Sequence, residues 1–326
     1  MGFRLGKYEI KHGLCLAPMA GYTDRAMRLV CHEAGAEYSV TEMVSAKAVV
    51  YNDKKTFFLA KILSDEGPVA IQIFGSEPEI MAEAAGALIK SPEGSRAIAI
   101  DINMGCPVNK IYSNGEGSAL MKNPDLIYRI TRAVSSAIDI PTTVKIRSGI
   151  NKNSINATEC ALAAEEGGAS LVCVHGRTKE QMYGGSADRE IIENVKSSLH
   201  IPVIANGDIL SGEDAVAMLR DTNADGIAVG RGAVGNPFIF SEIKAALEGG
   251  EYVTPSLEER IDTAIRQLRI AVEDKGERVA IPEARKQIAL YLKSFRGAAR
   301  IRGEINRATT SSEVEAALKS ALDEEN

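Results

Sequence analysis

The chain has 326 residues, of which 45% are hydrophobic and 25% charged, and its formal net charge is −6. These values are typical of globular proteins and exclude a disordered chain. No apolar run approaches the roughly 20 residues of a membrane span, and the polar first ten residues lack the apolar stretch of a secretory signal. We therefore expect a cytoplasmic protein with no membrane association and no obligate protein partner.

Taken in chain order, short apolar runs alternate with segments of helical spacing between residues 14 and 230. This alternation predicts parallel strands joined by helices. The eight predicted strands are Leu14–Met19, Tyr38–Met43, Val69–Phe74, Ala97–Ile102, Thr142–Arg147, Ser170–His175, Pro202–Asn206 and Asp225–Gly230. The clearest helical segments are Pro78–Lys90, Pro124–Ala137, Ala157–Glu166 and Gly212–Arg220.

Eight βα repeats favour an α/β fold of the closed (β/α)8 type, a TIM barrel. The alternative is an open doubly wound sheet, which usually has fewer strands and a glycine-rich phosphate loop after the first one. Residues 17–21 read Ala-Pro-Met-Ala-Gly at that position, without such a loop. The sequence therefore predicts the barrel.

The strand pattern stops after Phe240. Helices are predicted at Leu257–Glu273, Ile281–Phe295 and Ser312–Leu322, separated by breakers at Gly276, Pro282 and Gly297. We place a domain boundary near residue 245, giving a barrel domain over 1–245 and a helical domain over 246–326. Residues 255–310 contain 12 basic against 8 acidic side chains, an excess that the overall charge conceals. This local excess makes the helical domain the candidate surface for a polyanion.

Polar residues gather where the predicted strands end, the usual place of a barrel active site. The loops after strands seven and eight carry Gly207, Gly230, Arg231 and Gly232, which suit backbone and guanidinium contacts to a phosphate. An alternative is that the glycines only form tight turns. Residues 230–235 also match G-x-G-x-x-G, but they follow the last strand, so we interpret them as a mononucleotide phosphate loop.

Lys145 lies inside an apolar strand, where a buried ammonium requires a nearby anion. The pyrimidine edge of a reduced flavin would supply one, and the Gln72 amide could offer the same ring a donor and an acceptor. An alternative is that Lys145 pairs with Asp101 or Glu42. His175 closes a strand before a glycine and an arginine, which favours the site over a structural role in the core.

The five cysteines are an odd number without a C-x-x-C pair, which argues against a disulfide framework, and no metal site is expected. Four of them lie in apolar or helical patterns and are predicted to be buried. Cys106 instead lies in a loop of Asn, Gly and Pro, where an accessible thiol could exchange a proton with a substrate. The alternative is that it has no chemical role.

Several long motifs resemble the tRNA-dihydrouridine synthases, and most closely their bacterial DusB-type branch. The similarity covers most of the chain. Its motifs are Leu-Ala-Pro-Met-Ala-Gly-Tyr-Thr-Asp at 16–24, Thr-Glu-Met at 41–43, Gln-Ile-Phe-Gly at 72–75, Asp-Ile-Asn-Met-Gly-Cys-Pro at 101–107, Val-Lys-Ile-Arg at 144–147, His-Gly-Arg-Thr at 175–178, Ile-Ala-Asn-Gly-Asp at 204–208 and Gly-Arg-Gly at 230–232.

The resemblance implies an FMN enzyme that reduces the C5=C6 bond of specific tRNA uridines to 5,6-dihydrouridine, with NADPH as electron donor. Cys106 matches the family's general acid, which delivers a proton to C5 while the hydride goes to C6. The implied FMN contacts are Pro18, Met19, Ala20, Gln72, Lys145, His175, Asn206, Gly207, Asp208, Gly230 and Arg231. The basic helical domain would bind tRNA, with contacts expected at Arg285, Lys286, Arg296, Arg300 and Arg302.

Two segments depart from the family pattern. The chain has no Trp, and residues 288–291 read Ile-Ala-Leu-Tyr near the place where relatives often carry one; residues 148–151 read Ser-Gly-Ile-Asn instead of a Gly-Trp-Asp continuation. These departures concern the tRNA footprint and the target position. Two rival functions are a flavin barrel acting on a free pyrimidine and a non-catalytic RNA-binding protein.

Overall fold

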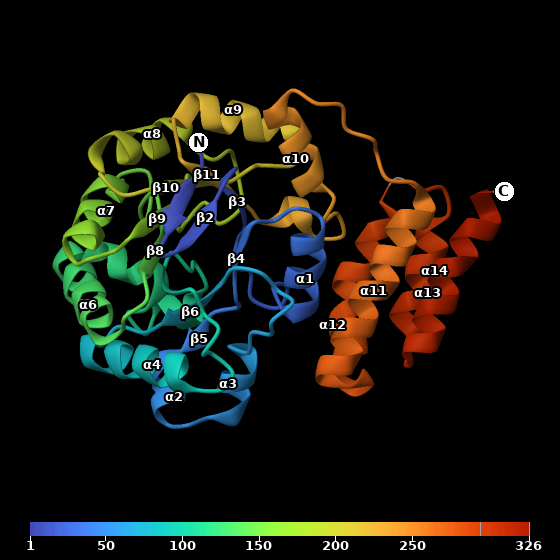
Figure 1. Ribbon diagram of the computed structural model, residues 1–326, viewed down its shortest axis with the longest axis horizontal. Coiled ribbons are helices and arrows are strands. Elements are labelled where there is room, and N and C mark those ends of the chain that lie inside the picture. The colour runs from blue at the N-terminus through green and yellow to red at the C-terminus, as the bar shows by residue number, and fades with distance from the viewer. Residues whose placement is uncertain (294, 326) are drawn as a thin grey trace.

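A closed ring of parallel strands forms the centre of the larger of two parts (Figure 1). The computed structural model describes residues 1–293 and 295–325. The ring contains β3 (Leu14–Leu16), β4 (Tyr38–Val40) with its continuation β5 (Val44–Ser45), β6 (Val69–Phe74), β7 (Ala99–Met104), β8 (Thr142–Arg147), β9 (Leu171–His175), β10 (Val203–Asn206) and β11 (Gly226–Val229). The β4–β6 pairing and the β11–β3 pairing close it, so the predicted eight-stranded barrel is confirmed.

Helices surround the ring on its outer side (Figure 1). They are α1 (Arg25–Glu33), α2 (Ala46–Val50), α3 (Lys54–Leu59), α4 (Pro78–Lys90), α6 (Pro124–Ala137), α7 (Ala157–Glu166), α8 (Arg189–Ser198), α9 (Gly212–Thr222) and α10 (Ile239–Glu248). Their first turns are set locally: the Asp24 carboxylate caps the Met27 amide of α1, and α4 and α6 each begin with a proline. Among the described residues, no helix is both long and apolar enough to span a bilayer.

Strand side chains divide into two packed layers. Those facing outward, such as Leu16, Ile71 and Val144, pack beneath the helices in the main core. Those facing inward, such as Val40 and Leu171, fill the barrel. This alternation is the period-2 pattern of a strand, and both faces carry apolar side chains because both are buried, with polar residues such as Gln72 and Asp101 on the inner face.

An N-terminal hairpin that the sequence did not reveal closes one end of the barrel. It consists of the antiparallel strands β1 (Phe3–Leu5) and β2 (Tyr8–Ile10). Its apolar side chains pack against the first residues of several barrel strands, and the Phe3 ring meets the Tyr38 ring edge-on at 6.4 Å between centroids. The amino ends of the strands are thereby covered, which leaves their carboxyl ends for a site.

The second part is a bundle beside the barrel (Figure 1). Its elements are α11 (Leu257–Lys275), α12 (Glu277–Ile288), the short 3₁₀ helix η3 (Ala289–Leu292), α13 (Ala298–Arg307) and α14 (Ser311–Glu325). The expected boundary near residue 245 falls inside α10, which packs on the barrel through Ile239, Phe240 and Ile243 and ends at Glu248. The extended segment after Glu248 therefore separates the two parts.

The expected break at Pro282 is wrong, because this proline lies inside α12. It is exposed, so the carbonyl that loses its helical donor can be solvated there. The predicted helix Ile281–Phe295 is instead divided into α12 and η3, and α13 was not anticipated between Gly297 and the last helix.

The bundle is held against the barrel by apolar and charged contacts. Ala26, Leu29 and Val30 of α1 pack against Ile270 and Ala271 of α11. Two partly buried lysine–aspartate pairs lie beside this contact: Lys275 Nζ is 2.6 Å from Asp24 Oδ2, and Lys61 Nζ is 2.8 Å from Asp274 Oδ1. The two parts therefore share a continuous interface.

Candidate active site

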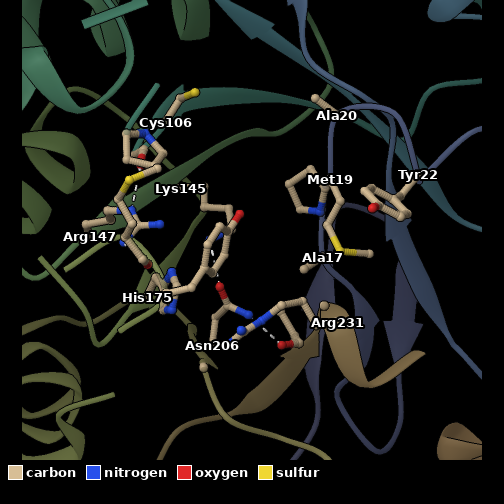
Figure 2. Close-up of a pocket in the computed structure, with 18 of the residues that line it drawn as sticks. Ala17, Met19, Ala20, Tyr22, Cys106, Lys145, Arg147, His175, Asn206 and Arg231 are labelled. Atoms are coloured by element: carbon tan, nitrogen blue, oxygen red, sulfur yellow. Dashed lines mark hydrogen bonds between the residues drawn. The ribbon is translucent and has the colours of Figure 1, made fainter. Parts of the chain in front are cut away.

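A cavity of about 580 Å³ opens at the carboxyl ends of the barrel strands. Figure 2 shows Cys106, Arg147 and His175 on one side of it and Met19, Ala20 and Tyr22 on the other. Every residue expected at the FMN site, and Cys106, lines this one cavity: Pro18, Met19, Ala20, Gln72, Cys106, Lys145, His175, Asn206, Gly207, Asp208, Gly230 and Arg231. The structure thus brings together residues from all parts of the barrel sequence.

The loops after β10 and β11 form one end of the cavity. Gly207 has φ +129°, and a Cβ there would lie 2.6 Å from the Ala187 Cβ, so this turn requires glycine. The Asp208 carboxylate is turned away from the cavity centre: it accepts from the Ala187 N–H at 2.8 Å and lies 2.7 Å from an Arg177 nitrogen. The half-exposed Arg231 guanidinium lies 3.6 Å from the same carboxylate. This end therefore combines two guanidinium groups, one carboxylate and backbone that comes close to the cavity.

Lys145 projects into the cavity from β8, and its partner is an amide rather than a carboxylate. Its Nζ donates to Asn206 Oδ1 at 2.8 Å. Within the described residues no carboxylate oxygen lies within 4 Å of this nitrogen, so the expected alternatives, Asp101 and Glu42, do not pair with it. Burial lowers the pKa of the Lys145 ammonium. A buried ammonium with only a neutral partner favours an anion in the cavity.

Asp101 and Glu42 have other partners. Asp101 accepts from Gln72 Nε2 at 2.7 Å and from Thr143 Oγ1 at 2.5 Å. Glu42 accepts from the Gly21 backbone N–H. Burial raises the pKa of both carboxyl groups.

The loop that carries Cys106 is held from three sides. Asn103 Oδ1 accepts from the Cys106 N–H at 2.9 Å, and the Ser118 hydroxyl donates to the Cys106 carbonyl at 2.8 Å. Arg147 Nε donates to the Gly105 carbonyl at 2.9 Å. The thiol is half-buried, and burial raises its pKa above the ordinary value. Near neutral pH it therefore keeps its proton. The other four cysteines are buried, as predicted.

His175 ends β9 with its ring between the cavity and several cations. Burial, assisted by Lys145, Arg147, Arg177 and Arg231, lowers its pKa to about 2. The imidazole is therefore neutral at physiological pH, and one ring nitrogen remains an acceptor. Its position on the cavity wall agrees with a site residue rather than one enclosed in the core.

Further cavity residues escaped the sequence prediction. Tyr183 is 55% exposed, and the Arg231 guanidinium lies 4.7 Å from its ring centroid. Leu290 reaches the cavity from η3 in the helical part. An aromatic residue followed by two glycines was a usable sequence signal for Tyr183. Leu290 is placed by domain packing, which local sequence does not encode.

The five cations expected to contact RNA lie on the helical part, and none of them lines this cavity. Lys286 and Arg296 are exposed. Arg285 donates to the Ala308 carbonyl, and Arg300 pairs with Glu304 one turn along α13. Arg302 is half-buried. Lys286 and Arg296 are therefore the better placed of the five for an external partner.

The closed barrel and the cavity at the carboxyl ends of its strands define an enzyme scaffold of the (β/α)8 class with an added helical part. Solved structures agree with the barrel: morphinone reductase superposes with a TM-score of 0.54 at 12% identity, covering 79% of this chain and 91% of that one. A variant of NCR from Zymomonas mobilis gives 0.55 at 15% identity, covering 79% and 94%.

Comparison of sequences narrows the class. Residues 15–326 match the dihydrouridine synthase (Dus) family. The chain is 39% identical to tRNA-dihydrouridine synthase B of Proteus vulgaris over 97% of both chains. It is 40% identical to the protein of that name from Shewanella oneidensis over 89% of both. The chain belongs to the dihydrouridine synthase family.

Proposed function

We propose that this enzyme reduces the C5=C6 bond of specific uridines in tRNA to dihydrouridine, with bound FMN, NADPH as electron donor and Cys106 as general acid. The observation that carries the proposal is the convergence of Cys106, Lys145 and both glycine-rich loops on one cavity. Its volume lies within the usual range for small-molecule sites, about 300–1,000 Å³.

The cavity residues fit FMN by charge and shape. Arg231 and the backbone of Gly207, Asp208 and Gly230 would hold the phosphate, because close backbone N–H groups and a guanidinium favour an anion. Lys145 would face the pyrimidine edge of the ring, where its ammonium offsets negative charge. The other expected contacts, Pro18, Met19, Ala20, Gln72, His175 and Asn206, would line the ring and the sugar chain.

FMN, when bound, supplies the hydride that reduces the uracil ring. The protein must then supply a proton at C5, and the protonated Cys106 thiol is suited to donate it. The fixed backbone of its loop would hold the thiol in place during the transfer. A uridine within folded tRNA must first be unstacked to enter the cavity.

The helical part would bind the rest of the tRNA. Residues 255–310 carry 12 basic against 8 acidic side chains, and Lys286 and Arg296 extend from this region into solvent. Phosphate contacts from such cations give affinity without sequence preference. We therefore assign residues 1–245 with the end of α10 to catalysis and the bundle to tRNA binding.

The test uses purified full-length protein. It should show flavin absorption or bind added FMN, and with NADPH it should convert uridine to dihydrouridine in tRNA isolated without that modification, detected by mass mapping. Free uracil and uridine serve as controls for the rival substrate class. A protein that cannot bind FMN, or one that turns over free pyrimidine and leaves tRNA unchanged, contradicts the proposal.

A further inference from the structure

Asp101 lies within β7 as a buried carboxylate, 3% exposed. Within the described residues no lysine or arginine nitrogen lies within 4 Å of its oxygens, and the two groups that donate to it are neutral: Thr143 Oγ1 at 2.5 Å and Gln72 Nε2 at 2.7 Å. A buried carboxylate without a cation is costly. The function proposed above gives it no part.

The hydrogen bonds continue from Asp101 to the Cys106 loop. Gln72 Oε1 accepts from Asn103 Nδ2 at 2.8 Å. Asn103 Oδ1 accepts in turn from the backbone N–H groups of Gly105, at 3.2 Å, and Cys106, at 2.9 Å. Every bond therefore donates in the same direction, from the Cys106 backbone toward Asp101.

The two ends determine this direction. A primary amide can turn by 180° and exchange its donor for its acceptor with almost no change of shape. The Asp101 oxygen that faces Gln72 accepts, and the two backbone N–H groups at the other end can only donate. If the Gln72 amide were reversed, its oxygen would face a carboxylate oxygen. If the Asn103 amide were reversed, its nitrogen would face two N–H groups.

We propose that Asp101 is a positioning residue that acts through Gln72 and Asn103 to fix the backbone that carries Cys106. Its role in turnover depends on the function proposed for Cys106, whereas the order of the hydrogen bonds does not. An acceptor at position 101 is the required property, rather than the negative charge or the side-chain volume.

Three variants separate these properties. Asp101→Leu removes the acceptor, and it should slow single-turnover oxidation of reduced flavin by tRNA about 10- to 100-fold, as small displacements of reacting groups do. Asp101→Asn keeps an oxygen for Gln72, because the Thr143 hydroxyl can reverse and accept from the new amide. It should therefore stay near the wild-type rate. Thr143→Val removes only the donor on the far oxygen and is the matched control.

Two outcomes of these variants overturn the proposal. If flavin oxidation by tRNA slowed as much in Asp101→Asn as in Asp101→Leu, the negative charge rather than the acceptor would be the required property. A wild-type rate in Asp101→Leu would leave no positioning role. The rate at which iodoacetamide alkylates Cys106, measured by peptide mass spectrometry in the absence of tRNA, gives the same comparison without turnover. This alkylation rate should change in Asp101→Leu and in neither of the other two variants. An unchanged alkylation rate in Asp101→Leu contradicts the proposal.

The hydrogen-bond order is also measurable in the unaltered protein, so the proposal stays testable if Asp101→Leu does not fold. Neutron diffraction from deuterated crystals should show deuterium on the Gln72 atom that faces Asp101 and on the Asn103 atom that faces Gln72. Deuterium in the reverse positions overturns the proposal. If wild-type protein shows the expected order but does not act on tRNA, the proposed function fails while the positioning role of Asp101 stands.

Discussion

At the scale of single residues, the Cys106 thiol is set apart from the other four by its place at the cavity. Burial raises its pKa, so the thiol stays protonated at neutral pH, and in the proposed function it would act as a proton donor rather than as a nucleophile. Cys106→Ala should leave flavin content and NADPH-driven flavin reduction nearly unchanged. It should slow oxidation of reduced flavin by tRNA by about 10²–10⁴-fold, the usual contribution of a general acid. Anaerobic stopped-flow measurement of each half-reaction checks this.

Cys31→Ala is the matched control, because Cys31 is fully buried on the inner face of α1 and does not line the cavity. It should lower thermal stability and leave the rates of flavin reduction by NADPH and of flavin oxidation by tRNA unchanged. Oxidation by tRNA at the wild-type rate in Cys106→Ala would end the general-acid assignment.

His175 makes the unfolding free energy depend on acid pH. Its pKa is about 2 in the folded protein, because of burial and nearby cations, against about 6.5 in an unfolded chain. Below pH 6.5 the unfolded chain therefore binds the extra proton, and the folded state loses up to about 1.4 kcal/mol per pH unit from this group. Urea unfolding of the flavin-free protein between pH 7 and 5 should show the loss, and His175→Gln should flatten it. Equal slopes for both proteins would contradict the assigned cause.

The sequence predicted the site well where a residue's role follows from its position at a strand end. Lys145, Asn206 and Arg231 were found in this way, since parallel strands end at one edge. The Asn206 amide was not anticipated as the partner of Lys145, because that contact depends on side-chain geometry across the barrel. The order of bonds from Asp101 to Cys106 was inaccessible for the same reason.

At the scale of elements, Gly235 is the point where the loop after β11 meets η3. Its φ is +69°, and a Cβ there would lie 2.5 Å from the Leu290 Cβ and 2.7 Å from the Leu290 carbonyl carbon. Gly235→Ala should therefore move the helical part away from the barrel. The cost should be about 1–3 kcal/mol of overpacking in addition to the cost of left-handed backbone. Urea denaturation and limited proteolysis after Glu248 check both effects.

Gly249→Ala is the matched control, since its φ is +67° and a Cβ there meets nothing within 4 Å. It should cost only the backbone strain, about 1–2 kcal/mol. If the two variants are equally stable and equally resistant to protease, the packing of Gly235 on Leu290 does not hold the parts together.

The bounds of strands and helices that are long enough to show a clear repeat of buried residues were predicted well. β6 and β8 have the expected bounds, as do α4, α6 and α7. The N-terminal hairpin was missed because three-residue strands carry too few positions to show alternation. A proline is locally unfavourable inside a helix, which is why Pro282 predicts a break, yet the packing of Ile281, Ala284 and Ile288 keeps α12 continuous.

At the scale of the whole molecule, tRNA affinity should depend on the exposed cations of the bundle. Replacing Lys286 and Arg296 by Gln should weaken binding and reduce the slope of log affinity against log salt by about 1 for each phosphate that the protein no longer neutralises. NADPH oxidation by the flavin should be unaffected, because the cavity is untouched. Filter binding across a salt series measures both quantities.

A control for net charge is Arg129→Gln with Lys90→Gln, two changes of the same sign on α4 and α6, on the other side of the barrel from the bundle (Figure 1). These should leave the affinity and the slope close to wild type. A bundle variant that behaves like this control would place the tRNA footprint elsewhere.

The N-terminal hairpin also constrains how the chain can fold during translation. Its apolar face, with Phe3 and Leu5, is covered by residues as distant as Leu171, Ile204 and Ala228, and the Gly2 N–H donates to the Asp225 carbonyl at 2.9 Å. At about 5–20 residues per second, the ribosome needs roughly 10–45 s to supply these partners. The hairpin is therefore synthesised long before most of its native contacts are available. During this time the apolar face of the hairpin is exposed on the nascent chain, where it is open to non-native association until the barrel closes.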